Sequence, residues 1–209
     1  MAQFIKKIQR LSVIERTWKM NRTIVAKIYF LLLISMPVIA KPNYSTEDRD
    51  QFFQTNSCIK CDLTGVDFTY TRHKNAMLEN ARLMYSAFTH SKFDESNFVG
   101  AYFTKSEGYY AQFRNSNFTS AHLNYVHFYF NELSGSNFIK ADLRNANFTG
   151  SNLSSVNFTN ANVDGADFTK AILIGSNLSA DQISKVKSLK CAILPNGEMS
   201  FPVQGQSCD

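Results

Sequence analysis

The chain has 209 residues, of which 44% are hydrophobic and 19% charged, proportions typical of an ordinary folded domain. Its formal charge of +5 is concentrated at the start, because residues 1–40 hold seven Lys or Arg and one Glu, whereas the remainder holds 15 Lys or Arg against 16 Asp or Glu. A body that is almost neutral excludes the basic surface by which proteins bind nucleic acid, so we expect no nucleic-acid partner.

Residues 1–40 have the features of an export signal. All seven basic residues precede the apolar run Ile28 to Ala40, which ends in the Val38-Ile39-Ala40 pattern that signal peptidases accept. The run is short for a membrane span, so attachment to a membrane through an uncleaved signal is the alternative. A start at Met20 would give a signal peptide of ordinary length, with residues 1–19 as an upstream extension. The sequence therefore predicts a periplasmic or secreted protein.

Residues 41–60 are expected to form an N-terminal cap. The stretch Ser45-Thr46-Glu47-Asp48 is similar to a capping box and predicts a short helix that runs to about Gln54. This helix would precede the regular pattern that begins near Cys61.

The chain has an even number of cysteines, which in an exported protein indicates disulfides. They are Cys58, Cys61, Cys191 and Cys208, and three pairings are possible. Cys58-Ile59-Lys60-Cys61 also resembles a redox or zinc motif, but no second pair of Cys or His completes a metal site, so we expect a structural role and no metal. We prefer Cys191 with Cys208, which would close a tail loop around the Asn196-Gly197 turn, and Cys58 with Cys61.

From Leu63 to Ile183 the sequence repeats with a period of five, which fits neither a helix nor a strand. A large apolar residue, called here a centre, occupies 23 of the 25 fifth positions, with His73 and Gly108 as exceptions. A small or short side chain lies two residues before each centre up to Leu178, with Asn131 as the one exception before Asp181. Because residues i and i−2 of an extended segment point to one side, and because five is odd, one bend per repeat is needed to keep every centre inside. The chain must therefore wind into an all-β solenoid with one corner per five residues.

The order of the centres predicts four sides per turn. Aromatic centres alternate with Leu or Val between Phe118 and Phe168, which requires an even number of sides if like residues are to stack. With 20 residues per turn, one interior column would contain Phe98, Phe118, Phe138 and Phe158, and the opposite one Phe128, Phe148 and Phe168. An outward column of Asn97, Asn117, Asn137, Asn157 and Asn177 would pass side-chain hydrogen bonds between coils. Residues 61–183 would make about six coils, about 29 Å long.

The repeats "ADLRNANFTG" and "SNLSSVNFTNANVDGADF" resemble the pentapeptide repeat family, A(D/N)LXX, over about six tenths of the chain. The resemblance implies a right-handed quadrilateral β-helix. The segments "CIKCDLTGVDF" and "LSADQISKVKSLKCAILPNGE" are also similar to the ends of exported members. Because an open solenoid exposes backbone at both ends, we expect a second cap helix over Asp181 to Leu189, and residues 184–209 as a cap with a disulfide-tied tail.

Outward aromatic residues mark a candidate binding surface. Four-sided geometry places Tyr70, His90, Tyr110 and Phe130 in one outward column, Tyr109 and Tyr129 beside it, and Tyr85 and Tyr125 in an edge column. Exposed rings often mark a protein or glycan surface, whereas the alternative is that they only cover the coil edges. The candidate contacts are Tyr70, Tyr85, Tyr109, Tyr110, Tyr125, Tyr129 and Phe130.

Two irregular centres carry separate predictions. Gly108 removes a ring from the core, so "SEGYYAQF" is predicted to bulge and to re-aim its tyrosines. His73 is expected to bond to a cap or to backbone rather than to a ligand. The carboxylates of Asp94 and Glu95 are expected on a solvated face, and no catalytic constellation or cofactor motif is recognised.

These features favour an exported, non-enzymatic binding or structural module, monomeric or dimeric end to end, whose partner is a protein or a glycan. The family resemblance implies an alternative, because some members mimic DNA in shape and charge, bind DNA gyrase and protect it from quinolones. A near-neutral body and an export signal argue against that alternative.

Overall fold

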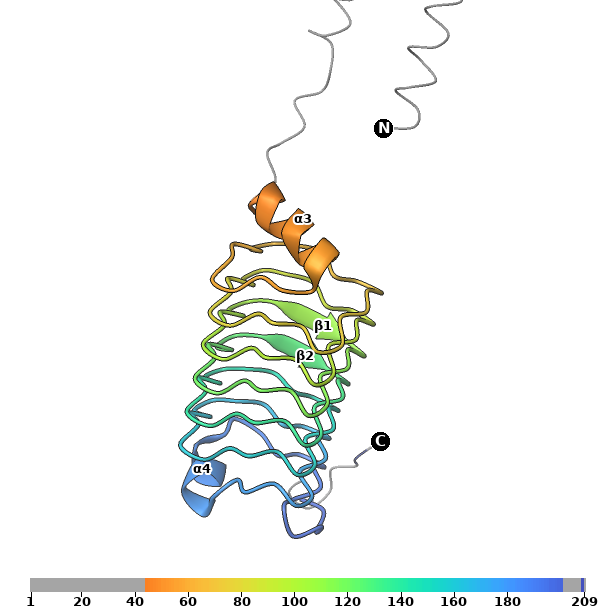
Figure 1. Ribbon diagram of the computed structural model, residues 1–209. Helices are drawn as coiled ribbons and strands as arrows, with labels where there is room; N and C mark the ends of the chain where they lie inside the picture. The colour runs from red at the N-terminus through yellow and green to blue at the C-terminus, as the bar shows by residue number, and fades with distance from the viewer. Residues whose placement is uncertain (1–43, 201–207, 209) are drawn as a thin grey trace, which may run out of the picture. The chain divides into compact units, whose positions relative to one another are not determined.

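The computed structural model describes residues 44–200 and 208, so the signal predicted for residues 1–40 lies outside the described part. Its helices and strands are α3 (Thr46–Thr55), β1 (Glu107–Tyr109), β2 (His127–Tyr129) and α4 (Ala180–Lys185). Between the helices the backbone forms stacked coils, and β1 and β2 lie side by side as parallel strands of successive coils (Figure 1). Within residues 44–200 no helix is long and apolar enough to cross a membrane.

The coils have the four-sided register predicted from the period of five. Parallel bridges join residues 20 apart from Ser57↔Met77 to Asn152↔Ile172. From Leu63 to Leu173 the second residue after every centre has a left-handed backbone, and a two-residue turn follows every centre except Gly108 and Phe128. Backbone amides and carbonyls pair with the coils on either side, as when Leu63 N donates to Arg82 O at 2.8 Å. Each coil therefore satisfies its backbone through its neighbours.

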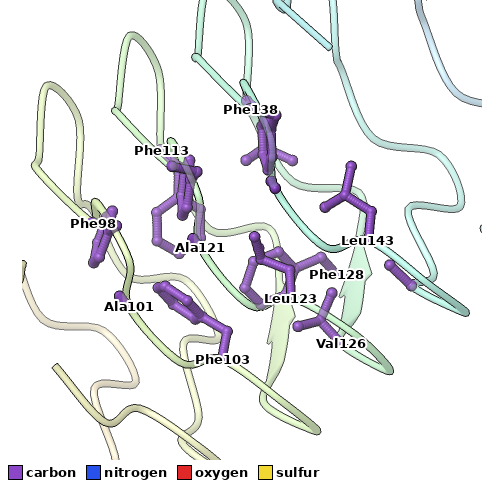
Figure 2. Close-up of a cluster of buried hydrophobic side chains, with 14 of the residues drawn as sticks. Phe98, Ala101, Phe103, Phe113, Ala121, Leu123, Val126, Phe128, Phe138 and Leu143 are labelled. Atoms are coloured by element: carbon purple, nitrogen blue, oxygen red, sulfur yellow. The ribbon is translucent and has the colours of Figure 1, made fainter. Parts of the chain in front are cut away.

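The interior contains stacked aromatic columns, as the alternation of centres predicts. Phe118 stacks on Phe98 and on Phe138, with ring centroids 4.9 and 4.8 Å apart. On the opposite side Phe148 stacks on Phe168 at 5.7 Å. Figure 2 shows Phe98, Phe128 and Phe138 pointing into the coils, and the buried residues Ala101, Ala121 and Val126 each lie two positions before a centre. The predicted columns are confirmed, with the difference that Phe128 meets Phe148 edge-on, at 6.2 Å between centroids, instead of stacking on it.

The predicted asparagine ladder is wrong for most of its length. The backbones of Asn97, Asn117, Asn137 and Asn157 do align in one column. Each of their side-chain oxygens, however, accepts from the amide two residues on, which is closer than the next coil, as in Asn137 Oδ1 with Ile139 N at 3.0 Å. Among the described residues only Asn177 donates to an asparagine one coil away, Asn157, at 2.8 Å.

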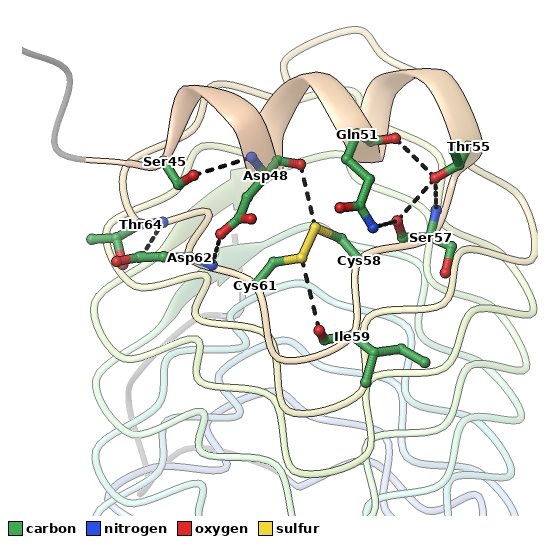
Figure 3. The surroundings of a disulfide bond; sticks show 10 residues. All are labelled: Ser45, Asp48, Gln51, Thr55, Ser57, Cys58, Ile59, Cys61, Asp62 and Thr64. Carbon is green, nitrogen blue, oxygen red and sulfur yellow. Dashed lines mark hydrogen bonds between the residues drawn. A yellow bond between two sulfur atoms is a disulfide. The ribbon is translucent and has the colours of Figure 1, made fainter.

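Helix α3 lies across the first coil, where a helix is expected from the sequence (Figure 1). The hydroxyl of Ser45 accepts from Asp48 N at 3.1 Å, and the helix ends at Asn56, whose φ is 57°. Phe52 is fully buried, with its ring 5.6 Å from that of Phe68. The Asp48 carboxylate does not close a capping box but accepts from Asp62 N at 2.8 Å, which ties the helix to the first coil (Figure 3).

The other end of the solenoid departs from the predicted register. Ile183 is not a centre, because it lies in α4, and this helix ends at Lys185 rather than near Leu189. The Gln182 amide donates to Phe158 O and Ala161 O at 2.9 Å each, so a side chain satisfies carbonyls that another coil would otherwise cover. After α4 the chain adds one more stretch of coil with a spacing of 21, through Asp167↔Ser188 and Ile172↔Ile193.

The cysteines form the two disulfides preferred from the sequence. Cys58 is joined to Cys61, with Cα atoms 5.4 Å apart, and Cys191 to Cys208, at 5.6 Å. Figure 3 shows the first disulfide directly beneath α3, where a sulfur of Cys58 lies 3.3 Å from Asp48 O. Asp48 approaches both sulfurs closely enough to suggest a metal site in residues 44–200. Because the sulfurs are bonded to each other, they offer no thiolate to a metal.

Candidate functional site

The predicted outward column of aromatic residues is present at one corner of the solenoid. It consists of Tyr70, His90, Tyr110 and Phe130, called here the Tyr70 column. Successive ring centroids lie 4.9, 5.4 and 5.5 Å apart with planes within 16° of parallel. The column ends on Gly150, where an added Cβ would lie 2.5 Å from two ring carbons of Phe130. Only glycine leaves room for the last ring.

The backbone of the Tyr70 column is strained. Its four residues have φ between 55° and 60°, a left-handed region that costs a residue with a Cβ about 1–2 kcal/mol. Gly and Asn tolerate this region, and they occupy many other corners of the solenoid, such as Gly65 and Asn145. An aromatic pair contributes about 0.5–1.5 kcal/mol, an amount similar to the strain. Stacking therefore gives this corner little net stability over Asn or Gly.

A tyrosine pair stands beside this column at the end of β1 and β2. Tyr109 and Tyr129 are paired in the backbone register and their rings stack at 4.9 Å. The Tyr129 hydroxyl accepts from Asn147 Nδ2 at 3.3 Å. Partial burial raises the pKa of the Tyr129 phenol, and Tyr109 and Asp167 act in the same direction, so the phenol remains a neutral hydrogen-bonding group.

The predicted edge column lies at the other corner of the same side. Tyr85, Lys105 and Tyr125, called here the Tyr85 column, occupy successive left-handed corners. The Lys105 ammonium lies over the Tyr85 ring, 5.8 Å from its centroid. All seven candidate residues thus flank one side of the solenoid, five at one corner and two at the other. Six of them are more than two-fifths exposed, and Tyr129 is half-buried.

One aromatic pair was missed in the sequence. Tyr102 stacks on His122 with centroids 4.5 Å apart, on the side of the solenoid that adjoins the Tyr85 column. Both residues directly precede a centre and are 20 residues apart, which was the available signal. They extend the aromatic surface around the Tyr85 column onto a second side.

The bulge predicted at Gly108 is wrong. Glu107, Gly108 and Tyr109 keep the 20-residue register with β2, and the ring of Tyr109 remains outside. Gly108 itself is buried, and Phe88 and Phe128, one coil to either side, approach to 6.3 Å across the position of the missing ring.

Asn131 accounts for the rest of the space at Gly108. Its side chain is fully buried, donates to Gly108 O at 3.2 Å and accepts from Ala111 N at 2.7 Å. A Cβ on Gly108 would lie 3.4 Å from Asn131 Nδ2. The two exceptions of the repeat therefore compensate each other, a small centre beside a large neighbour.

His73 bonds to the cap, as expected. Its Nδ1 lies 2.9 Å from the side-chain oxygen of Asn56, the residue that ends α3. The ring is 92% buried against Phe52 and Phe93, and this desolvation lowers the pKa of His73 to about 4. Its Nε2 has no partner among the described residues, so His73 is neutral at pH 7.

Asp94 and Glu95 form separate ion pairs on the surface. Asp94 binds Arg114 at 2.6 Å and Glu95 binds Lys74 at 2.9 Å. The two carboxylates therefore do not act as a pair.

The sequence matches the family model for pentapeptide repeats in eight copies, over residues 61–100, 81–119, 111–150 and 151–180. A search among curated proteins finds no match.

Several solved structures are similar in fold. One is QnrB1, a plasmid-mediated fluoroquinolone resistance protein, at 22% identity over 67% of this chain and 82% of that chain, with a TM-score of 0.41. Another is HetL, a pentapeptide repeat protein involved in heterocyst differentiation regulation from the cyanobacterium Nostoc, at 18% identity over 75% and 99% of the two chains, with a TM-score of 0.27. A third, from the Arabidopsis thaliana thylakoid lumen, is 24% identical over 57% and 72%, with a TM-score of 0.24.

Proposed function

Because the chain belongs to the pentapeptide repeat family, whose fold is a right-handed quadrilateral β-helix, we propose that it is an exported, non-enzymatic binding module. In this proposal about six coils, closed by α3 and α4, form a monomeric rod that presents its aromatic side to a protein or glycan partner. The seven candidate residues named above make the contacts.

The observation that carries the proposal is the gathering of exposed rings at one corner of the solenoid. Tyr70, Tyr110 and Phe130 are each more than two-fifths exposed. Their left-handed backbone is shared by other corners, such as Lys140 and Ser155, so the rings and not the backbone distinguish this corner. Contact with a partner would bury these rings.

Export is part of the proposal and is supported by two observations. All cysteines among the described residues form disulfides, which persist in oxidising compartments. The basic and apolar segment 1–40 is typical of a cleaved signal. We expect the protein recovered from its host to begin at Lys41, outside the cytoplasm, with both disulfides formed. An intact, reduced chain in the cytosol would refute export.

A photo-crosslinking experiment tests the binding role. A photoreactive phenylalanine at Tyr110 should trap a discrete partner in host cells, whereas the same group at Lys140, a corner on the other side of the rod, should not. Tyr109→Thr with Tyr129→Thr should abolish the adduct because it removes two of the proposed contacts. The variant should still fold, because Thr69 and Thr149 show that the same position of the coil accepts threonine. Equal labelling from both corners, or an adduct that survives the double substitution, would contradict the proposal.

DNA mimicry is the less supported function. Mimicry of DNA needs a strongly acidic surface, but several acidic residues here are paired with neighbouring basic residues, such as Asp142 with Arg144 at 2.8 Å. A supercoiling assay with purified gyrase separates the two functions.

A further inference from the structure

The side between the two aromatic corners carries an acidic row. Its outward residues are Asp67, Ala87, Glu107, His127, Asn147 and Asp167, joined by successive bridges. This row has no Lys or Arg, whereas two other outward rows contain Arg82 or Arg72 and Lys92, and the asparagine row is uncharged. The aromatic columns therefore flank the one outward row that holds acids and no basic residue, and of its three acids Asp167 is paired with Lys187 at 3.2 Å.

The short side chain of Ala87 lies between two acidic residues. Asp67 and Glu107 lie one coil to either side of it, so their backbones are about 9.6 Å apart at a strand spacing of about 4.8 Å. The Glu107 carboxylate is exposed and makes no ion pair or hydrogen bond with any described residue. The nearest corner cation, Lys105, lies over the Tyr85 ring instead. A cationic side chain of a partner would meet both acids beside a tyrosine face.

The middle of the Tyr70 column favours a peptide over a sugar chain. His90 and Tyr110 have neighbours on both ring faces, so their edges and the tyrosine hydroxyl face solvent. Sugars bind aromatic residues through open ring faces, whereas apolar peptide groups pack against ring edges and backbone carbonyls accept from hydroxyls.

The spacing of the two acidic residues favours one backbone conformation of the partner segment. A polyproline II helix rises about 3.1 Å per residue with three residues per turn, so every third side chain recurs on one edge after about 9.3 Å. This repeat matches the separation of Asp67 and Glu107. Proline-rich segments dock on aromatic grooves in this conformation. The row also begins at a depression of about 490 Å³ beside α3, where one end of such a segment would fit. Its lining is Tyr44, Arg49, Asp50, Phe53, Val66 and Asp67, and the Arg49 guanidinium is paired with Asp50.

We propose that this side binds an extended proline-rich segment of a partner protein that carries Arg or Lys at every third residue. Arginines contact Asp67 and Glu107 over Ala87, and the prolines pack against the Tyr70 and Tyr85 columns. This inference rests on the proposed function and names the partner class for the same surface.

The test measures binding of three labelled 12-residue peptides to the disulfide-bonded protein by fluorescence anisotropy. One repeats Pro-Pro-Arg, the second repeats Pro-Pro-Glu, and the third has the composition of the first with its four arginines contiguous. We expect the first to bind best. Asp67→Asn with Glu107→Gln should weaken it about tenfold, and Ala87→Arg, which places a cation between the two acids, should abolish it. Glu107→Gln alone should weaken it less, whereas Glu132→Gln, which also removes one charge but on the neighbouring side, should have no effect.

Equal binding of the contiguous peptide, or equal loss with Glu132→Gln, would show unspecific charge attraction and overturn the inference. Preferential binding of a hexamer of N-acetylglucosamine would also overturn it, because a glycan would then be the occupant. If no peptide binds while the Tyr110 crosslink remains sensitive to the tyrosine substitutions, the inference fails and the proposed function stands.

Discussion

The compensation between Gly108 and Asn131 can be tested by restoring the repeat at both positions. Gly108→Leu alone adds a side chain whose Cβ would lie only 3.3 Å from Phe88 Cβ and 3.4 Å from Asn131 Nδ2. This overpacking should cost about 1–3 kcal/mol. Asn131→Ser alone removes the hydrogen bond to Gly108 O and opens a void, at a cost of about 1–3 kcal/mol.

The double variant should be more stable than the sum of these effects. A serine at 131 can accept from Ala111 N, as Ser116 accepts from Ser96 N at 3.1 Å. The leucine would occupy the space that the asparagine leaves, and its burial contributes about 1.5–3 kcal/mol. We therefore expect a favourable coupling of at least about 2 kcal/mol.

The assay is urea unfolding of the four proteins with disulfides intact, followed by circular dichroism, with equal m-values as the condition for comparison. Additive changes, within about 0.5 kcal/mol, would show that the two exceptions are unrelated and would refute the compensation. Val126→Ala, which creates a void in the next repeat without touching Gly108, is the matched control and should be additive with Gly108→Leu.

Three further results are expected. Because the pKa of His73 falls from 6.5 unfolded to about 4 folded, stability should decrease by up to about 3 kcal/mol as pH falls from 6.5 towards 4, and thermal melts of His73→Leu should lack this slope. Tyr110→Asn should change the free energy of unfolding by less than about 1 kcal/mol, since relief of strain offsets lost stacking; a larger loss would assign the column to structure. Replacing Cys191 and Cys208 by Ser should lower stability by up to about 3 kcal/mol in urea, for a loop of 17 residues.

Most of the fold could be predicted from the period of five, because this period restricts the path of the backbone. An odd repeat with an inward centre permits only a corner in every repeat, and the alternation of Phe118, Leu123 and Phe128 selects four sides. The columns of rings follow by counting in steps of 20. The register failed at Ile183, where a helix replaces a corner, because the centre alone does not distinguish a coil from a short amphipathic turn.

Contacts between coils were harder to foresee. The side chain two before a centre reaches the carbonyl of a residue 23 positions earlier, as Ser116 reaches Phe93 O at 2.8 Å. Gly108 and Asn131 are related by the same 23 positions, but this relation becomes visible only when the coils are stacked. Read one repeat at a time, Gly108 indicated a bulge. The asparagine side-chain oxygens likewise accept a hydrogen bond from an amide two residues away, and this local bond is not visible when residues are only aligned in columns.

The hydrogen bonding of the coils limits how a partner can bind along the described part of the rod. Amides and carbonyls on each side pair with the coils before and after, so a partner strand has no free backbone edge to join there. The two ends are occupied by α3 and by the chain around α4. Recognition along the rod must then rest on side chains, which the backbone holds at a fixed spacing of about 4.8 Å. The exposed stacked rings at one corner and the unpaired Glu107 carboxylate are the features for which such a scaffold offers no structural reason, and this is why we assign the contacts to this side.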